Sequence, residues 1–239
     1  SLVGSEMCIR DRRELYIVEG DSALGSVKMA RNAEFQAVIP VRGKILNCLK
    51  ADYDKIFKNE IITDLIKVIG CGVEVKTGKN KEISMFNLDN LRWNKIVICT
   101  DADVDGFHIR TLILTMLYRL VPTLIEKGYV YIAESPLFEI TTSDKTYFAY
   151  DENEKTKILK MIGNKKFDIQ RSKGLGENEA EMMSLTTMDP ATRRLIKIEP
   201  DDIEQTQWMF DMLLGDDLQG RKDFITNNGV DYLDMADIS

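Results

Sequence analysis

The sequence predicts an α/β fold, with a mostly parallel sheet flanked by helices and a smaller α+β unit after it. In the first part of the chain, short apolar runs alternate with segments of helical apolar spacing, a pattern typical of parallel sheets. After Pro136 this alternation stops, and a hairpin and several short helical segments follow. With 239 residues, of which 44% are hydrophobic and 30% charged, the chain is long enough to bury a substantial core.

Local patterns predict the elements of the first part in order. Strands are expected where apolar runs lie between turn residues, at 15–18, 35–39, 96–100 and 129–133. Helices are expected where apolar residues recur three or four positions apart, at 22–31, 50–69 and 109–126. Ser22 is the expected N-cap of the first helix, Pro40 closes the second strand, and Gly70 and Gly128 end the later helices. The polar stretch 76–94 is expected to be a loop or a small insertion.

The second part is expected to be smaller and mixed. Apolar and aromatic residues on both sides of Thr142-Ser-Asp-Lys145 predict a hairpin formed by 137–141 and 146–150. Helical spacing predicts four further helices, at 154–162, 179–185, 203–214 and 221–227.

Composition excludes some classes of protein. A net charge of −7 argues against binding to nucleic acid through a broad basic surface, although a local basic patch with a bound cation is compatible with it. No apolar run approaches the roughly 20 residues of a membrane span, so no membrane is expected. The four cysteines show no paired spacing, and we expect Cys71 and Cys99 to be small core residues in a reducing compartment.

Three aspartates follow the strand predicted at 96–100. Asp101, Asp103 and Asp105 stand at alternate positions, and Gly106 then allows a turn. Carboxylates this close repel one another unless a cation lies among them, and hard oxygen ligands favour Mg²⁺ or Ca²⁺. Because open α/β sheets bind ligands at the carboxyl ends of their strands, the motif predicts a divalent metal site there.

The same motif has two other interpretations. An EF-hand loop needs a glutamate at its twelfth position, but that position is Leu112 here, and a strand rather than a helix leads into the motif. A solvated acidic turn without a ligand stays open as an alternative. The only histidine, His108, is expected to orient a carboxylate or to be structural rather than to act as the acid–base residue.

Glu19 ends the first predicted strand as Asp101 follows a later one. In a parallel sheet both residues reach the same edge, so Glu19 is a candidate fourth carboxylate of the metal site. The alternative is a carboxylate in the first turn of a helix, where the helix dipole stabilises it.

Two segments concentrate basic residues beside glycines. Arg42 and Lys44 flank Gly43, and Arg171 and Lys173 precede Gly174. Such turns are suited to phosphate binding, because glycine allows a close approach and the side chains supply charge-assisted donors. A solvated basic turn is the alternative for the first of them.

Four segments in one order carry a resemblance to a known family. They are Glu19-Gly-Asp-Ser-Ala23, Val41-Arg-Gly-Lys-Ile-Leu-Asn47, the aspartate motif with His108, and Gln170-Arg-Ser-Lys-Gly-Leu-Gly-Glu177. Together they resemble the Toprim domain and carboxyl-terminal tail of the B subunits of bacterial type II topoisomerases, either gyrase or topoisomerase IV. The resemblance implies a Rossmann-like Toprim domain over 13–136 and a tail unit over 137–239.

The resemblance also implies roles for single residues. Glu19, Asp101 and Asp103 match catalytic positions that bind Mg²⁺, and Asp105 lies close to the metal. The reaction is reversible cleavage of DNA, in which a tyrosine of the partner A subunit attacks the phosphodiester. Positions associated with DNA binding are Arg42, Lys44, Asn47, Arg171 and Lys173.

Further expectations concern the whole protein. Residues 1–12 are expected to be a non-native leader, because Ser1 to Asp11 resembles a translated sequencing-adapter read-through. The chain is then a carboxyl-terminal fragment that lacks the upstream ATP-binding domain and is inactive alone. The expected setting is an A₂B₂ heterotetramer on DNA in the bacterial cytoplasm, associated with the nucleoid. The alternatives are another Toprim phosphoryl-transfer enzyme, primase-like or nuclease-like, and a non-catalytic scaffold that binds DNA or the A subunit.

Overall fold

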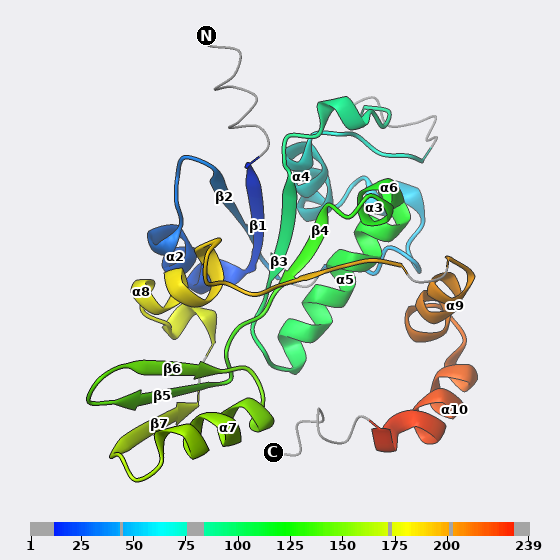
Figure 1. Cartoon of the computed structure of the whole chain (residues 1–239). Helices are drawn as coiled ribbons and strands as arrows, with labels where there is room; N and C mark the ends of the chain where they lie inside the picture. The colour runs from blue at the N-terminus through cyan, green and yellow to red at the C-terminus, as the bar shows by residue number, and fades with distance from the viewer. Residues whose placement is uncertain (1–11, 44, 76–83, 172–173, 201–202, 232–239) are drawn as a thin grey trace. The chain divides into compact units, whose positions relative to one another are not determined.

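The structure, a computed structural model, describes residues 12–43, 45–75, 84–171, 174–200 and 203–231 (Figure 1). The expected leader, apart from Arg12, and the predicted DNA-binding residues Lys44 and Lys173 lie outside these ranges. The chain groups into two compact units. The first unit comprises 1–43, 95–102 and 131–197, and the second comprises 44–94, 103–130 and 198–239.

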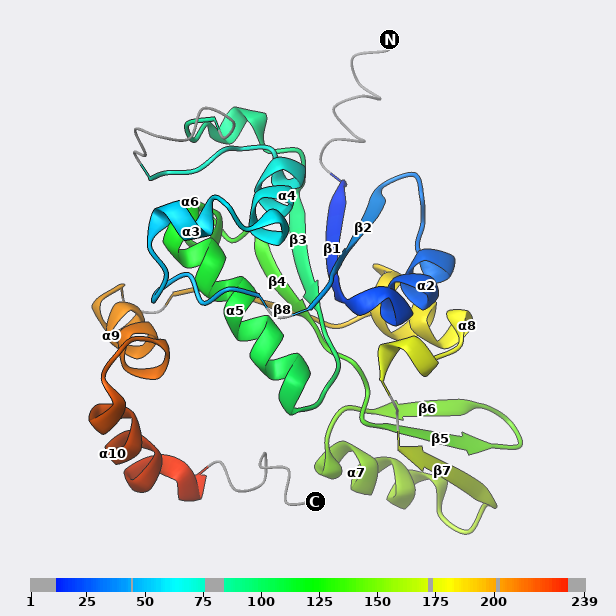
Figure 2. The same cartoon turned by 180° about the vertical axis from the view of Figure 1, so that it is seen from behind.

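A five-stranded sheet forms the centre of the first unit, with the strand order β2-β1-β3-β4-β8 (Figures 1 and 2). The strands are β1 (Glu14–Glu19), β2 (Gln36–Val41), β3 (Lys95–Cys99), β4 (Val130–Ala133) and β8 (Leu195–Lys197). β1 pairs in parallel with both β2 and β3, whereas β8 is antiparallel to β4. The predicted α/β class, with a mostly parallel sheet, is confirmed.

The position of β2 at the edge of the sheet explains a wrong prediction about Pro40. The sequence predicts that Pro40 closes the strand, but it lies within β2 and pairs with Val18. Proline has no backbone N–H to donate, and an edge strand tolerates this because one side has no partner strand.

Helix α2 (Gly20–Ala30) follows β1 without an intervening loop. The prediction that Ser22 caps this helix is wrong, because Glu19 is the N-cap residue and its side chain makes no capping hydrogen bond. Gly20 has φ +70°, a backbone angle that residues with a side chain rarely adopt. Glycine at this position therefore permits the abrupt change from strand to helix. Ala23 and Val27 of α2 pack in one buried cluster with apolar side chains of β1 and β3, namely Tyr16, Val18, Val97 and Cys99.

The residues between β4 and β8 also belong to the first unit. The predicted hairpin is confirmed as β5 (Phe138–Thr142) and β6 (Thr146–Ala149), and α7 (Glu152–Ile162) follows it. The sequence interpretation missed β7 (Phe167–Arg171), which pairs with β5, and also the three-residue strand β8. All five side chains of β7 are exposed. The strand predictions are based on apolar residues that form a buried face, and β7 has no such face.

The predicted helix 179–185 is part of a longer, irregular segment. It comprises η2 (Leu175–Glu177), α8 (Ala180–Met183) and a π-helical turn, η3 (Ser184–Met188). Leu175, Met183 and Met188 enter the same buried cluster as α2.

In the second unit, two helices predicted as continuous are divided. The range 50–69 contains α3 (Tyr53–Ile56) and α4 (Glu60–Ile69), because Asn59 caps α4 by accepting a hydrogen bond from the Ile62 N–H (3.1 Å). The range 109–126 contains part of α5 (Val104–Leu120) and then α6 (Pro122–Glu126). Pro122 has no N–H, so it begins a helix instead of continuing one.

The other elements of the second unit agree more closely with expectation. The described part of the polar stretch before β3 holds the short η1 (Leu88–Asn90) and a single β-bridge from Met85 to Val73. Helices α9 (Ile203–Leu214) and α10 (Leu218–Asn228) match the last two predicted helices. Cys71 and Cys99 are buried, as expected for small core residues, and Cys48 is buried as well. In the described part of the chain, no helix is long and apolar enough to cross a membrane.

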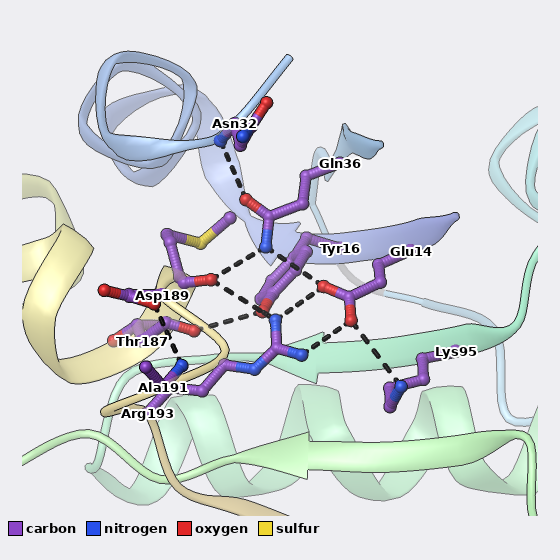
Figure 3. Close-up of polar contacts among 10 residues, drawn as sticks. Glu14, Tyr16, Asn32, Gln36, Lys95, Thr187, Asp189, Ala191 and Arg193 are labelled. Carbon is purple, nitrogen blue, oxygen red and sulfur yellow. Dashed lines mark hydrogen bonds and ion pairs between the residues drawn. The ribbon is translucent and has the colours of Figure 1, made fainter. Parts of the chain in front are cut away.

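A buried ion pair holds the start of β1 in the first unit (Figure 3). The Glu14 carboxylate accepts two hydrogen bonds from the Arg193 guanidinium, at 2.5 and 2.6 Å, and a third from Gln36 Nε2 at 3.0 Å. The Glu14 and Arg193 side chains are only 3% and 5% exposed. Arg193 also donates to the Tyr16 hydroxyl (2.8 Å), which itself donates to the Thr187 carbonyl (3.0 Å).

This network joins β1 and β2 to the segment that follows the π-helical turn. Burial is the main reason why the pKa of Tyr16 is raised, so its hydroxyl remains a neutral donor at ordinary pH. Gln36 Nε2 and Arg193 also donate to the Met188 carbonyl, at 2.8 and 3.3 Å. The polar groups around the pair are thus partnered, which is the condition for a buried pair to be tolerated.

We predict that Arg193→Ala lowers the free energy of unfolding by about 3–5 kcal/mol, because it leaves a buried carboxylate without its ion-pair partner. Lys95 Nζ, 3.7 Å from Glu14, is too distant to replace the two lost hydrogen bonds. Urea denaturation followed by circular dichroism measures this change. Arg42→Ala is the matched control, because it breaks an ion pair with Asp21 whose side chains are 68% and 64% exposed. In this control, the free energy of unfolding should fall by at most about 1 kcal/mol. Equal decreases in the two variants would contradict the prediction.

Candidate metal and DNA site

Two of the predicted metal ligands meet at the carboxyl edge of the sheet. In the parallel register of β1 and β3, Val18 pairs with Cys99, so Glu19 and Thr100 are the next residues along the two strands. The backbone N–H of Asp101 donates a long hydrogen bond (3.4 Å) to Glu19 Oε2. Residues 82 positions apart in the sequence are therefore neighbours, as the parallel sheet predicted.

A loop from the carboxyl-terminal part of the chain holds the Asp101 carboxylate. The backbone N–H of Leu175 donates to Asp101 Oδ1 at 2.7 Å. The sequence interpretation treated the loop at 171–177 as a basic element that could face DNA and missed this contact. No local pattern signals it, because a backbone amide makes the contact and not a side chain.

The other two aspartates belong to the second unit and have different local roles. Asp103 is the N-cap residue of α5, and its Oδ1 accepts a hydrogen bond from the Gly106 N–H at 2.7 Å. Asp105 lies exposed in the first turn of α5, where the helix dipole favours a carboxylate. The expected start of this helix at residue 109 is therefore wrong, and exposed His108 lies within α5, not at its beginning.

Glu19 and Asp101 fit a hard divalent cation, since both supply carboxylate oxygens at one sheet edge. Thr100, which directly precedes Asp101, is 3% exposed, and its hydroxyl has no hydrogen-bond partner among the described residues. A buried hydroxyl needs such a partner, and water bound to a cation would supply one. Within the same described ranges, no three His, Cys, Asp or Glu side chains are already grouped around one metal position.

Arg42 lies at the same edge of the sheet as Glu19. It follows Val41, which is the register partner of Glu19 in β2, and Gly43 then turns the chain with φ +83°. Arg42 Nε donates to both carboxylate oxygens of Asp21, at 2.9 and 3.0 Å, and both side chains are exposed. The structure therefore brings Arg42 to the edge that carries Glu19 and Asp101.

The remaining predicted DNA-binding residues have other surroundings. Asn47 lies in the second unit, where its amide donates to the Leu214 carbonyl (3.0 Å) and accepts from the Leu49 N–H (3.0 Å). Arg171 ends β7 and is exposed at a cleft of about 750 Å³. Three glutamates also line this cleft, so its charge is predominantly acidic: Glu139, Glu177 and Glu179.

Two family models match the chain. The Toprim domain model matches residues 14–135, just over half of the chain, and the model described as DNA gyrase B subunit, carboxyl terminus, matches residues 164–226. The first match contains Glu19 and Asp101, and the second contains Arg171 and Leu175.

Relatives agree with both models. The chain is 44% identical over 221 residues to the DNA gyrase B subunit of Thermotoga maritima, covering 92% of this chain and 33% of the relative. It is 46% identical to the protein of the same name from Mycoplasmoides gallisepticum and 43% identical to that from Archaeoglobus fulgidus, each time covering 90% of this chain and 32% of the relative. The chain thus spans about a third of the length of these relatives. Because the Toprim model matches more than half of the chain, the chain belongs to the Toprim family, and its carboxyl-terminal part is similar to that of DNA gyrase B subunits.

Proposed function

We propose that this chain supplies the metal-binding half of a DNA cleavage and religation site, and that a tyrosine of a partner A subunit supplies the nucleophile. The observation that carries the proposal is the meeting of Glu19 and Asp101 at one sheet edge, with the Asp101 N–H donating to Glu19 Oε2. The gyrase B carboxyl-terminal match favours this function over primase-like or nuclease-like Toprim chemistry.

Each acidic residue has a proposed role. Glu19, Asp101 and Asp103 would hold Mg²⁺, with Asp105 close by. When bound, the ion would stabilise the charge that develops on the phosphate and the leaving oxygen. Glu19 is also our candidate for carrying a proton to and from the 3′-oxygen, because it is partly buried at the strand end.

The basic residues are proposed to hold the DNA backbone. Arg42 presents a guanidinium whose Nε pairs with both carboxylate oxygens of Asp21, and a phosphate group could accept charge-assisted hydrogen bonds from the same guanidinium. Lys44, Asn47, Arg171 and Lys173 are proposed to make further contacts. Since phosphate contacts position a protein without reading sequence, we propose that cleavage is only weakly sequence-selective.

The whole protein is proposed to be longer than this chain. We propose a Toprim domain over 13–136, a carboxyl-terminal unit over 137–239, and an upstream ATP-binding domain that couples ATP hydrolysis to passage of duplex DNA through a double-strand break. The proposed assembly is an A₂B₂ heterotetramer that works on nucleoid DNA in the cytoplasm. The chain alone should then neither hydrolyse ATP nor relax DNA.

We predict that Glu19→Gln and Asp101→Asn each reduce Mg²⁺-dependent DNA cleavage by about 100-fold or more, because each removes a negative ligand that holds the stabilising charge. The substitutions are made in the full-length protein assembled with its A subunit, and cleaved DNA is measured over time on gels. Glu34→Gln, which changes an exposed glutamate in the turn between α2 and β2, is the matched control and should cleave at the normal rate. Normal cleavage by Asp101→Asn would remove Asp101 from the metal site.

We predict that Lys44→Ala weakens binding to duplex DNA and lowers the slope of log affinity against log salt by about 0.9, the value of one phosphate contact. Fluorescence anisotropy at several salt concentrations measures both quantities. Lys67→Ala, at an exposed lysine of α4, serves as the control and should leave the slope unchanged. An unchanged slope for Lys44→Ala would exclude that lysine from the DNA interface.

A further inference from the structure

We infer that the segment 174–176 is a positioning element for the Asp101 carboxylate. The inference rests on the proposed function, since it concerns a residue proposed to hold the metal ion. Asp101 lies in the range matched by the Toprim model, whereas the segment lies in the range matched by the gyrase B carboxyl-terminal model. A proposed metal ligand in the range of one family model is thus held by backbone from the range of the other, within the first compact unit.

The segment lies close to both oxygens of the carboxylate. The Leu175 N–H donates to Oδ1 at 2.7 Å, a short distance typical of a hydrogen bond to a charged acceptor. A Cβ atom added at Gly174 would lie only 2.7 Å from Oδ2 and 3.3 Å from Cγ. Because Gly174 has φ −56° and ψ 155°, which any residue can adopt, glycine is required here for space and not for backbone freedom.

The segment is itself fixed to the helix that follows Glu19. The Leu175 side chain is 1% exposed and packs in the buried cluster with Ala23 and Val27 of α2. The Ser26 hydroxyl donates to the Gly176 carbonyl at 3.3 Å, and a Cβ atom at Gly176 would meet Ser22 Cβ at 2.7 Å. The amide of Leu175 therefore has little freedom to follow a moving carboxylate.

This arrangement would affect Mg²⁺ binding by fixing the orientation of the Asp101 carboxylate. With Oδ1 held by an amide and Gly174 leaving room beside Oδ2, the carboxylate is restrained to one orientation before a cation arrives. Groups that orient a metal ligand in this way typically change metal affinity by about 10–100-fold. The segment should therefore set the Mg²⁺ concentration that cleavage requires more than the maximal rate.

The test is Gly174→Ala, which adds one methyl group against Asp101 without straining the backbone. In the full-length protein assembled with its A subunit, the Mg²⁺ concentration for half-maximal cleavage should rise about tenfold, while the rate at saturating Mg²⁺ changes by less than about threefold. Gly25→Ala is the matched control, because a Cβ atom at that position of α2 would meet no described atom outside its own helix within 4 Å. An unchanged Mg²⁺ requirement in Gly174→Ala would overturn the inference.

A second measurement needs neither metal nor activity. Amide hydrogen exchange of Leu175 in the metal-free chain reports its hydrogen bond to Asp101 directly. Exchange should become about tenfold faster in Gly174→Ala and in Asp101→Ala, but not in Gly25→Ala, because a typical hydrogen bond changes an equilibrium by about that factor. Slow exchange in Asp101→Ala would overturn the inference even if Gly174→Ala folds poorly.

The two proposals fail in different ways. If Asp101→Asn cleaves normally while Leu175 exchange depends on Asp101, the contact is real but Asp101 is not the metal ligand that the proposed function assigns. If Asp101→Asn abolishes cleavage while Gly174→Ala keeps the normal Mg²⁺ requirement, the metal ligand is right and the positioning role is wrong.

Discussion

The parallel pairing of β1 with β2 and β3 is the constraint on which the candidate site depends. Parallel strands end at one edge, so the residues that end or follow them are neighbours there: Glu19, Arg42 and Asp101. The pairing is possible because β1 is almost entirely buried between two strands, while the proline of β2 faces an edge that needs no donor. Two carboxylates and one guanidinium thus gather where an α/β sheet binds its ligands.

The segment 174–193 supports this sheet at both ends of its central strands. At the carboxyl end, Leu175 donates to Asp101 and packs against α2. At the amino end, Arg193 pairs with Glu14 and donates to the Tyr16 hydroxyl (Figure 3). The part of the carboxyl-terminal family match that lies in the first unit, 164–197, is therefore not an appendage of the sheet, because it partners a buried charge and a proposed metal ligand.

Local contacts partner two of the charged groups at the candidate site. The chain carries a net charge of −7, yet Arg42 is neutralised by Asp21 and the Asp101 carboxylate is partnered by a backbone amide. A cation at Glu19 and Asp101 would add positive potential at the same edge, where a phosphate group could then replace Asp21 as the partner of Arg42. Local placement of charge, and not the overall balance, makes DNA binding compatible with an acidic chain.

The sequence by itself determined the α/β class, the strand that ends at Glu19, the strand that precedes Asp101 and the hairpin, because each has a local signal in apolar spacing or turn residues. It did not reveal where helices divide, since the cap at Asn59 and the proline at Pro122 interrupt an apolar pattern that continues past them. Nor did it reveal that the cap at Asp103 begins α5 before residue 109. It also did not reveal β7, whose side chains are all exposed. Only the tertiary structure decided that Leu175 holds Asp101 and that Arg193 pairs with Glu14. Both contacts join segments more than 70 residues apart, and one is made by a backbone amide, which every residue except proline carries and which no sequence pattern therefore marks.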